Sequence, residues 1–239
     1  MINELKKGIV FASLLVISVV SPVFAVPQNI QLDTEAVVKA KQAMNMDSTF
    51  WYSPNKIKIE SVIKKSASNP NNVKSTILFD NTKKMAYMLT DATKTAIKID
   101  VNSMSNMQGG NGSINASMLA DPKDVEKKVK QQGGKKVGTE KILGYLCDIW
   151  QVNVDAINPE TNQKEKAVTK MWLSQELKLP LKVEMTSPTK GSLLTITTKR
   201  IKTNVDYSST FFDIPKGYQI TDMNEMLMQM QKQTTQKRK

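Results

Sequence analysis

The chain has 239 residues, with no histidine and one cysteine, and its 34 lysines and arginines outnumber its 22 acidic residues to give a net charge of +12. The lack of histidine excludes Ser-His-Asp and Cys-His catalysis and His-ligated zinc or haem. A single cysteine excludes an intramolecular disulfide and a thiolate zinc site. The hydrophobic fraction of 40% is typical of a globular protein.

Lysine supplies almost all of the positive charge, because Arg200 and Arg238 are the only arginines. Proteins that bind nucleic acid usually gather arginines and interleaved aromatic residues on one surface, and this chain has no such cluster. We therefore expect no nucleic-acid partner. The lysines favour a transient contact with an anionic surface such as a membrane, or they are solvated residues on the outer faces of strands.

The first 25 residues have the pattern of an export signal. Lys6 and Lys7 precede an apolar run at 8–20, and Val23-Phe24-Ala25 forms a small-x-Ala cleavage site. The alternative is a retained membrane anchor, but the run of about 13 residues is shorter than the ~20 that an anchor needs. No cysteine follows Ala25 directly. We expect cleavage after Ala25 and a soluble exported protein without a lipid anchor of its own.

Residues 33–46 are predicted to form a short helix, which Asp33 or Thr34 is suited to cap. The apolar residues at helical spacing are Ala36, Val37, Ala40 and Met44. Beyond residue 46 apolar and polar residues alternate, which indicates strands joined by short turns in an antiparallel meander. The predicted strands of this part are 56–64, 73–79, 85–90 and 95–101.

Residues 102–117 are rich in Gly, Asn and Ser and predict a mobile loop. A helix is expected to begin at Asp121-Pro122 and to end at Gly133-Gly134. A second series of alternating segments follows, and its first member is apolar on both faces from Tyr145 onward. The predicted strands of this part are 136–154, 168–173, 181–185, 193–205 and 210–214.

The C-terminal residues are predicted to form a helix. Asp222 and Glu225 resemble a capping box at its start. One apolar stripe at helical spacing consists of Met223, Met226, Leu227 and Met230. Residues 231–239 are polar and basic and are expected to fray.

These elements predict a mainly β (α+β) protein, with a curved antiparallel sheet or incomplete barrel of roughly nine to eleven strands. The three helices are the available cover for its concave side. We expect residues 26–220 to form a single domain, and residues 221–239 to form the C-terminal Met-rich helix and basic tail.

Several short sequence motifs occur in an order that is found in a known superfamily. Residues 138–147 join a Gly-x-Glu turn, a Gly-Tyr pair and a cysteine; the other motifs lie at 79–89, 171–173, 179–184 and 211–218. This order resembles the periplasmic lipoprotein-carrier (LolA/LolB-like) superfamily over about residues 50–220. It is most similar to exported, lipoprotein-sorting-like relatives of an uncharacterised subgroup.

The resemblance implies a half barrel with helices lying over its mouth as a lid, a periplasmic location, and an apolar cavity that binds acyl chains. The dedicated carriers latch this lid with an arginine in an early strand. Here the only basic candidates are Lys56, Lys58 and Lys64, and lysine cannot form a bidentate latch. This departure favours a related binding protein over a lipoprotein shuttle.

We therefore predict a non-enzymatic periplasmic monomer that binds a lipid or lipidated partner, with no cofactor and no metal. Asp100, Glu140 and Asp148 have no spacing that pairs them for catalysis. Cys147 is expected to be a free thiol, buried as a small apolar side chain. The ligand-cavity candidates, each of which a place in the core would equally explain, are Trp51, Tyr87, Trp150, Trp172, Met223, Met226, Leu227 and Met230.

An alternative function belongs to a different class. The protein would then be a structural, interaction or stress-sensing module of the cell envelope that binds a protein partner. Such a module needs a filled core and no ligand cavity.

Overall fold

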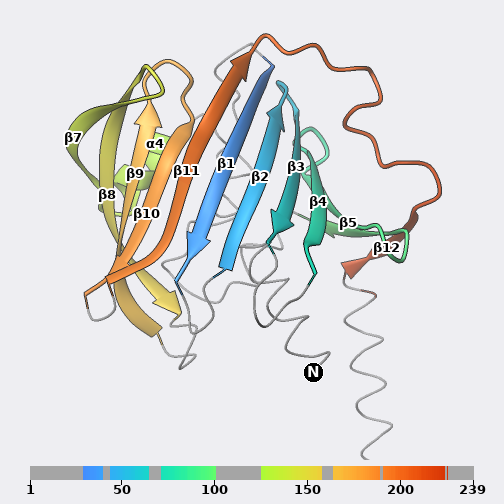
Figure 1. Ribbon diagram of the computed structural model, residues 1–239, viewed down its shortest axis with the longest axis horizontal. Helices are drawn as coiled ribbons and strands as arrows, with labels where there is room; N and C mark the ends of the chain where they lie inside the picture. Colours follow the sequence, from blue (N-terminus) through green and yellow to red (C-terminus); the bar gives the residue numbers. More distant parts are fainter. Residues whose placement is uncertain are drawn as a thin grey trace, which may run out of the picture.

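The computed structural model describes residues 29–39, 44–64, 71–100, 125–157, 164–188, 191–223 and 225. In these residues twelve strands form one sheet in the order β12-β6-β5-β4-β3-β2-β1-β11-β10-β9-β8-β7 (Figure 1). The strands are β1 (Ile30–Val38), β2 (Met44–Tyr52), β3 (Lys56–Ile63), β4 (Val73–Asp80), β5 (Met85–Thr90), β6 (Thr95–Asp100), β7 (Lys135–Ile142), β8 (Tyr145–Ile157), β9 (Lys164–Ser174), β10 (Pro180–Ser187), β11 (Gly191–Thr203) and β12 (Gln219–Asp222). One helix, α4 (Val125–Gln131), precedes β7.

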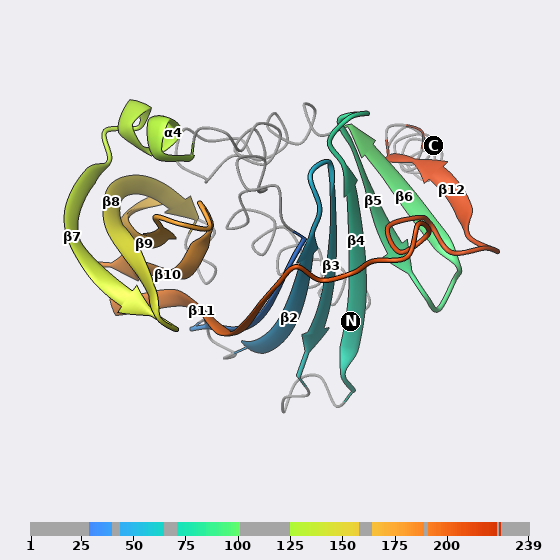
Figure 2. The same ribbon diagram turned by 90° about the horizontal axis from the view of Figure 1, so that it is seen from above.

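Two antiparallel meanders make up the sheet, and one long-range pairing joins them. Strands β1 to β6 form the first meander and β7 to β11 the second. The joint is the antiparallel pair β1–β11, which runs from Ile30 opposite Thr203 to Val38 opposite Leu194. β12 adds to β6 in parallel. Figure 2 shows the sheet bent into an open trough, with β7 and β12 at its two ends.

Most of the main core lies on one face of this bent sheet. Along β1 every second residue is buried, from Ile30 to Val38. Phe50 and Tyr52 of β2 stand opposite buried residues of β1 and β3 on the same face. We call this the inner face. Its alternation with polar residues is what a sheet with one covered face requires. α4 contributes Val129 to the same core cluster.

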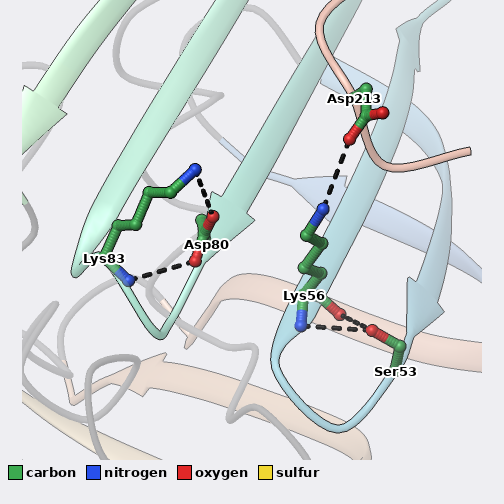
Figure 3. Close-up of polar contacts among 5 residues, drawn as sticks. All are labelled: Ser53, Lys56, Asp80, Lys83 and Asp213. Atoms are coloured by element: carbon green, nitrogen blue, oxygen red, sulfur yellow. Dashed lines mark hydrogen bonds and ion pairs between the residues drawn. The ribbon is translucent and has the colours of Figure 1, made fainter. Parts of the chain in front are cut away.

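The other, outer face is crossed by residues 204–218, which we call the strap. The Tyr207 hydroxyl donates a hydrogen bond to the Ile30 carbonyl oxygen at 2.9 Å. Phe211 packs edge-on against Trp51, with ring centroids 5.6 Å apart. Lys56 of β3 reaches Asp213 at 3.3 Å (Figure 3). Further along, Ile214 and Tyr218 pack against a small outer cluster of Leu78, Leu89 and Ala96.

The strap therefore links the end of β11 to β12 across the outer side of the first meander. Neighbouring turns of that meander are held by short polar contacts. Asp80, for example, accepts a hydrogen bond from the Lys83 amide at 3.0 Å and pairs with the Lys83 ammonium at 3.3 Å (Figure 3).

Much of the predicted strand pattern is confirmed. The four segments expected between residues 56 and 101 are β3 to β6, and Gly133 and Gly134 follow α4 after one residue, Gln132. The mainly β, largely antiparallel architecture is also confirmed. The sheet has twelve strands rather than roughly nine to eleven, because β1, β2 and β12 are strands that the sequence pattern does not predict.

The helix predicted at residues 33–46 is wrong, since β1 ends at Val38 and β2 begins at Met44. Ala36, Val37 and Met44 match helical spacing by coincidence. The residues that are buried together alternate instead, and β1 is paired on both sides, with β2 and with β11. Sheet pairing and one-sided burial override such a weak local helical preference.

The strand predicted at 210–214 is also wrong, because these residues form turns within the strap. Asp222 is the last residue of β12 and directly precedes Met223, which is helical, as is Glu225. Within the described residues the expected helical cover is thus limited to α4 and this C-terminal start. The predicted signal at 1–25, the loop at 102–117, and Met226, Leu227 and Met230 lie outside the described residues.

Candidate functional site

A pocket opens on the inner face, over the four central strands β2, β1, β11 and β10. It holds about 20 Å³ of free space, room for one water molecule and less than an acyl chain needs. Its lining is Leu32, Thr34, Ala36, Met46, Ser48, Phe50, Tyr52, Pro180, Leu181, Lys182, Val183, Ile196 and Thr198. Apolar side chains dominate this lining, and Met46 is the unbranched, adaptable one among them.

Hydroxyl side chains form one row across the floor of this pocket. Thr34 stands opposite Thr198 of β11 and Ser48 of β2, and Ser48 stands opposite Ser61 of β3. Ser61 in turn faces Ser75 of β4. The Oγ atoms of Ser48 and Ser61 are 2.8 Å apart, and the Thr34 hydroxyl donates to the Ser48 carbonyl oxygen at 3.3 Å. This row is the polar line on an otherwise apolar inner face.

Charged side chains of the first meander and of β11 lie on the outer face or at its edges. Arg200 pairs with Asp33 at 2.5 Å and Lys199 with Glu35 at 3.0 Å. Burial alone would raise the pKa of Asp33, but hydrogen bonds from Gln31 and Arg200 lower it. The inner-face positions of β1 to β6, by contrast, carry no charged residue. The pocket therefore suits an apolar or neutral group.

Two buried polar atoms on the inner face of the second meander have no hydrogen-bond partner among the described residues. They are Trp150 Nε1 on β8 and Thr169 Oγ1 on β9. Their strands are paired neighbours, with Trp150 opposite Met171 and Val152 opposite Thr169. The Lys130 ammonium of α4 lies 5.3 Å from the centre of the Trp150 ring. Unmade hydrogen bonds of this kind are costly when buried, so a polar atom of a ligand would be stabilised there.

The structure separates the aromatic cavity candidates between the two faces. Trp150 lies on the inner face. Trp51 and Tyr87 lie on the outer face beside the strap. Trp172 lies on the outer face of β9 and donates from Nε1 to Glu140 at 2.6 Å. Met223 packs partly buried against the main core cluster. These residues therefore do not converge on one cavity.

A second cavity lies between β4, β5 and the strap, with a volume of about 170 Å³. Tyr87 lines it together with Leu78 and Phe212. Its charged lining residues are already joined in two ion pairs, Lys56 with Asp213 and Lys83 with Asp80 (Figure 3). This cavity lies at the polar edge of the contact between the strap and the sheet, and its charged lining does not suit a hydrocarbon chain.

Cys147 is fully buried in β8, and its thiol lies 3.5 Å from the Tyr145 carbonyl oxygen. Burial raises the pKa of this thiol to about 11. A protonated, buried thiol is a poor nucleophile. Within the described residues no group of three or more His, Cys, Asp or Glu side chains is placed to hold a metal ion, and no helix has the length and apolar character to cross a membrane.

Sequence reasoning missed the hydroxyl row because it assigned Thr34 to a helix. The signal was present in the alternation of β1, where Thr34 takes the place of an apolar residue between Leu32 and Ala36. Ser48 and Ser61 occupy the matching positions of β2 and β3. A hydroxyl at the buried phase of three consecutive strands is the pattern that identifies such a row.

Comparison with known proteins adds a family and a fold. The model of a family described as "Domain of unknown function (DUF4412)" matches residues 35–179, more than half of the chain. The chain is similar to the crystal structure of an uncharacterized conserved protein from Thermus thermophilus, with a TM-score of 0.50 and 8% identity over 82% of this chain and 91% of that one. No curated protein matches.

Two solved structures are similar at lower scores. One is the MucA/MucB complex of Pseudomonas aeruginosa, with a TM-score of 0.44 and 8% identity over 80% of this chain and 56% of that chain. The other is a putative outer membrane lipoprotein-sorting protein domain from Vibrio parahaemolyticus, with a TM-score of 0.40 and 12% identity over 87% and 97%. The likeness to the Thermus protein concerns the fold alone, and the two weaker ones support no conclusion about activity.

Proposed function

We propose, from the premise that this chain belongs to the DUF4412 family of unknown function, that it is an exported, non-catalytic protein that binds a lipid or lipidated partner. The apolar part of the ligand lies against the inner face, at the pocket between β2, β1, β11 and β10. The inner face of β1 to β6, which carries no charged residue, supports this proposal most directly. Hydrocarbon requires a dry concave lining with few, neutral polar groups.

Hydroxyl groups and one indole N–H give the inner face a few neutral groups that can form hydrogen bonds with a ligand. Thr34, Ser48 and Thr198 line the pocket, and Trp150 Nε1 is a buried donor that no acceptor in the described part of the chain reaches. A neutral polar atom of an amphiphile would be accommodated by such groups. Each methylene that the ligand buries contributes about 0.8 kcal/mol, so binding needs no catalytic group.

The free space of about 20 Å³ sets a condition on this proposal. A hydrocarbon chain enters only if side chains over the central strands move aside. Met46 and the half-buried Met185 are suited to this, because methionine has three rotatable bonds and a polarizable sulfur. Ligand binding is therefore expected to repack the inner face rather than to fill an empty cavity.

Native mass spectrometry of the protein purified from its own periplasm tests the proposal, together with titration of a fluorescent fatty-acid probe. Two adjacent residues on opposite faces of β2 give a matched pair of variants. Ser48→Leu fills the pocket and is expected to weaken probe binding about tenfold. Thr49→Leu on the outer face should leave binding unchanged. Thermal unfolding of both variants checks that the fold is retained.

If no lipid copurifies and no probe binds, the lipid-binding proposal fails. The same small free space then favours the second candidate function, an envelope interaction module with a filled core. That candidate predicts a stoichiometric complex with one protein partner, and the complex should be insensitive to Ser48→Leu.

A further inference from the structure

Exposed large apolar side chains concentrate at one place among the described residues. Val137, Leu143 and Leu146 are 51%, 50% and 42% exposed, and all three belong to the β7–β8 hairpin. The remaining one, Ile220, is 55% exposed on β12 at the other end of the sheet (Figure 2). Single exposed apolar residues are ordinary, but a group of three on one hairpin is a surface feature that needs an explanation.

The turn of this hairpin places a leucine in a backbone conformation that leucine disfavours. Leu143 has a φ of 51° and Gly144 a φ of 88°. Two consecutive positive φ values are those of a type I′ turn, for which Asn-Gly is the favoured sequence. A leucine in the left-handed region is unfavourable, and half of this side chain is in solvent. Strain without a packing benefit points to a role outside the fold.

Lysines stand beside the exposed leucines. Lys141 faces Leu146 directly across the hairpin. Lys178 lies nearby, in the turn after β9: the Lys178 backbone amide donates to the Ser174 carbonyl oxygen at 3.0 Å, and the Gln175 backbone amide of the same turn donates to the Leu146 carbonyl oxygen at 2.9 Å. Lys136 is engaged with Asp148 at 2.9 Å. Within the described part of the chain, no ion pair engages Lys141 or Lys178.

We propose that Lys141, Leu143, Leu146 and Lys178, the tip patch, bind the surface of an anionic lipid bilayer. The two leucines enter the boundary between headgroups and acyl chains, and the two lysines lie against lipid phosphates. Apolar insertion combined with basic side chains is the arrangement by which peripheral proteins bind such surfaces. This docking needs no bound ligand and is independent of the proposed function of the inner face.

An added β-strand from a protein partner is the competing occupant of this edge. β7 is poorly suited to it. A register shift between Lys136 and Gly138 interrupts its pairing, and lysines along an edge strand discourage further strand pairing. The leucines also lie at the turn, beyond the stretch of backbone that a partner strand would use.

Sedimentation with vesicles tests the proposal. The protein should bind vesicles of phosphatidylglycerol mixed with phosphatidylethanolamine, bind phosphatidylcholine vesicles less, and detach as salt is raised. Leu143→Asn should weaken binding about tenfold, yet keep or raise the melting temperature, because asparagine tolerates a positive φ. Lys141→Gln should weaken binding about fivefold.

Ile220→Asn is the matched control, since it removes an equally exposed apolar side chain at the opposite end of the sheet. This variant should bind vesicles as the unaltered protein does. All variants share the same N-terminus, so any contribution of residues 1–25 to vesicle binding is the same in each. Equal binding of Leu143→Asn and the unaltered protein would overturn the proposal. The proposal would also be overturned if the unaltered protein did not bind anionic vesicles, or if it paired with a peptide strand at β7 instead of binding vesicles.

Discussion

Trp172 donates a 2.6 Å hydrogen bond from Nε1 to the Oε2 atom of Glu140, and the two side chains meet across the intervening strand β8. The Lys182 ammonium lies 4.3 Å from the centre of the same ring. Trp172 is only 5% exposed. The outer face of the second meander is thus fastened by a polar cluster built around one indole.

Removal of the Glu140 carboxylate should therefore destabilise the sheet. Glu140→Ala leaves the buried indole N–H without its acceptor, and we expect the free energy of unfolding to fall by about 1 kcal/mol. Glu140→Gln keeps an acceptor and should cost less. Urea unfolding followed by tryptophan fluorescence measures both. Thr139→Ala, the exposed neighbour, is the control; a loss as large as that of Glu140→Ala would disprove the role of this bond.

Cys147 should make stability depend on pH in the alkaline range. Burial raises the pKa of its thiol from 9.0 to about 11, and the carboxylates of Glu140 and Asp148 add to the increase. Below pH 9 the thiol is protonated in both states. Between pH 9 and about 11 the unfolded thiol ionises while the folded one stays protonated, so stability falls as pH rises.

Cys147→Ala removes this contribution of the thiol to the pH dependence of stability. The gap in unfolding free energy between the unaltered protein and Cys147→Ala should narrow from pH 9 to pH 11, while tyrosine ionisation affects both proteins alike. A thiol reagent should also label Cys147 slowly in the folded state and quickly in denaturant. Fast labelling of the folded protein would contradict the burial of this side chain.

Two glycines, Gly134 directly before β7 and Gly138 within β7, should respond differently to substitution by alanine. A Cβ at Gly134 would lie 2.6 Å from the Val129 carbonyl oxygen, where backbone cannot yield cheaply, whereas a Cβ at Gly138 would meet only Ile149 Cδ1 at 3.6 Å. Gly134→Ala should destabilise the protein by about 1–3 kcal/mol by displacing the end of α4. Gly138→Ala should be nearly neutral. Thermal unfolding compares them, and equal losses would refute the close approach.

The strap should detach when its aromatic anchor is removed. Phe211 stacks on Tyr207 at 4.9 Å and contacts Trp51 and Phe212 at similar distances. Phe211→Ala is expected to cost about 2 kcal/mol, less than for a fully buried phenylalanine. Limited proteolysis should then cut within residues 204–218. Ser209→Ala, an exposed strap residue, should leave the cleavage pattern unchanged; increased cleavage in both would show that the strap is not held by Phe211.

The strands that sequence alone identifies are those whose partners are close in the chain. Each of β3 to β5 pairs with the strand that follows it in the chain, and the alternation of apolar and polar residues in β3 to β6 is regular enough to identify each one. β1 differs because one of its two partners, β11, lies far along the chain. Its local sequence carries a weak helical pattern, and only the pairing on both sides fixes it as a strand.

The candidate site was harder to predict than the fold. Alternation separates the two faces of a strand but does not say which face the sheet bends toward. Trp51 and Trp150 are equally strong candidates by composition, yet one lies under the strap and the other faces inward. The strap has no periodic alternation of apolar and polar residues. Its turns at 210–214 contain apolar residues, which in the sequence alone are typical of a strand.

The central position of β1 also has a consequence for how the protein is made. Asn29 binds the Val205 carbonyl oxygen across 176 positions of the chain, and β1 acquires its second neighbour only when β11 is available. The two meanders therefore cannot pair through β1 and β11 before nearly the whole polypeptide has emerged from the ribosome. Closing so large a loop makes folding slow. Until β11 has been synthesised, the nascent chain cannot complete its sheet and stays at least partly unfolded. An unfolded chain is suited to passage through an export channel of the kind that the first 25 residues predict.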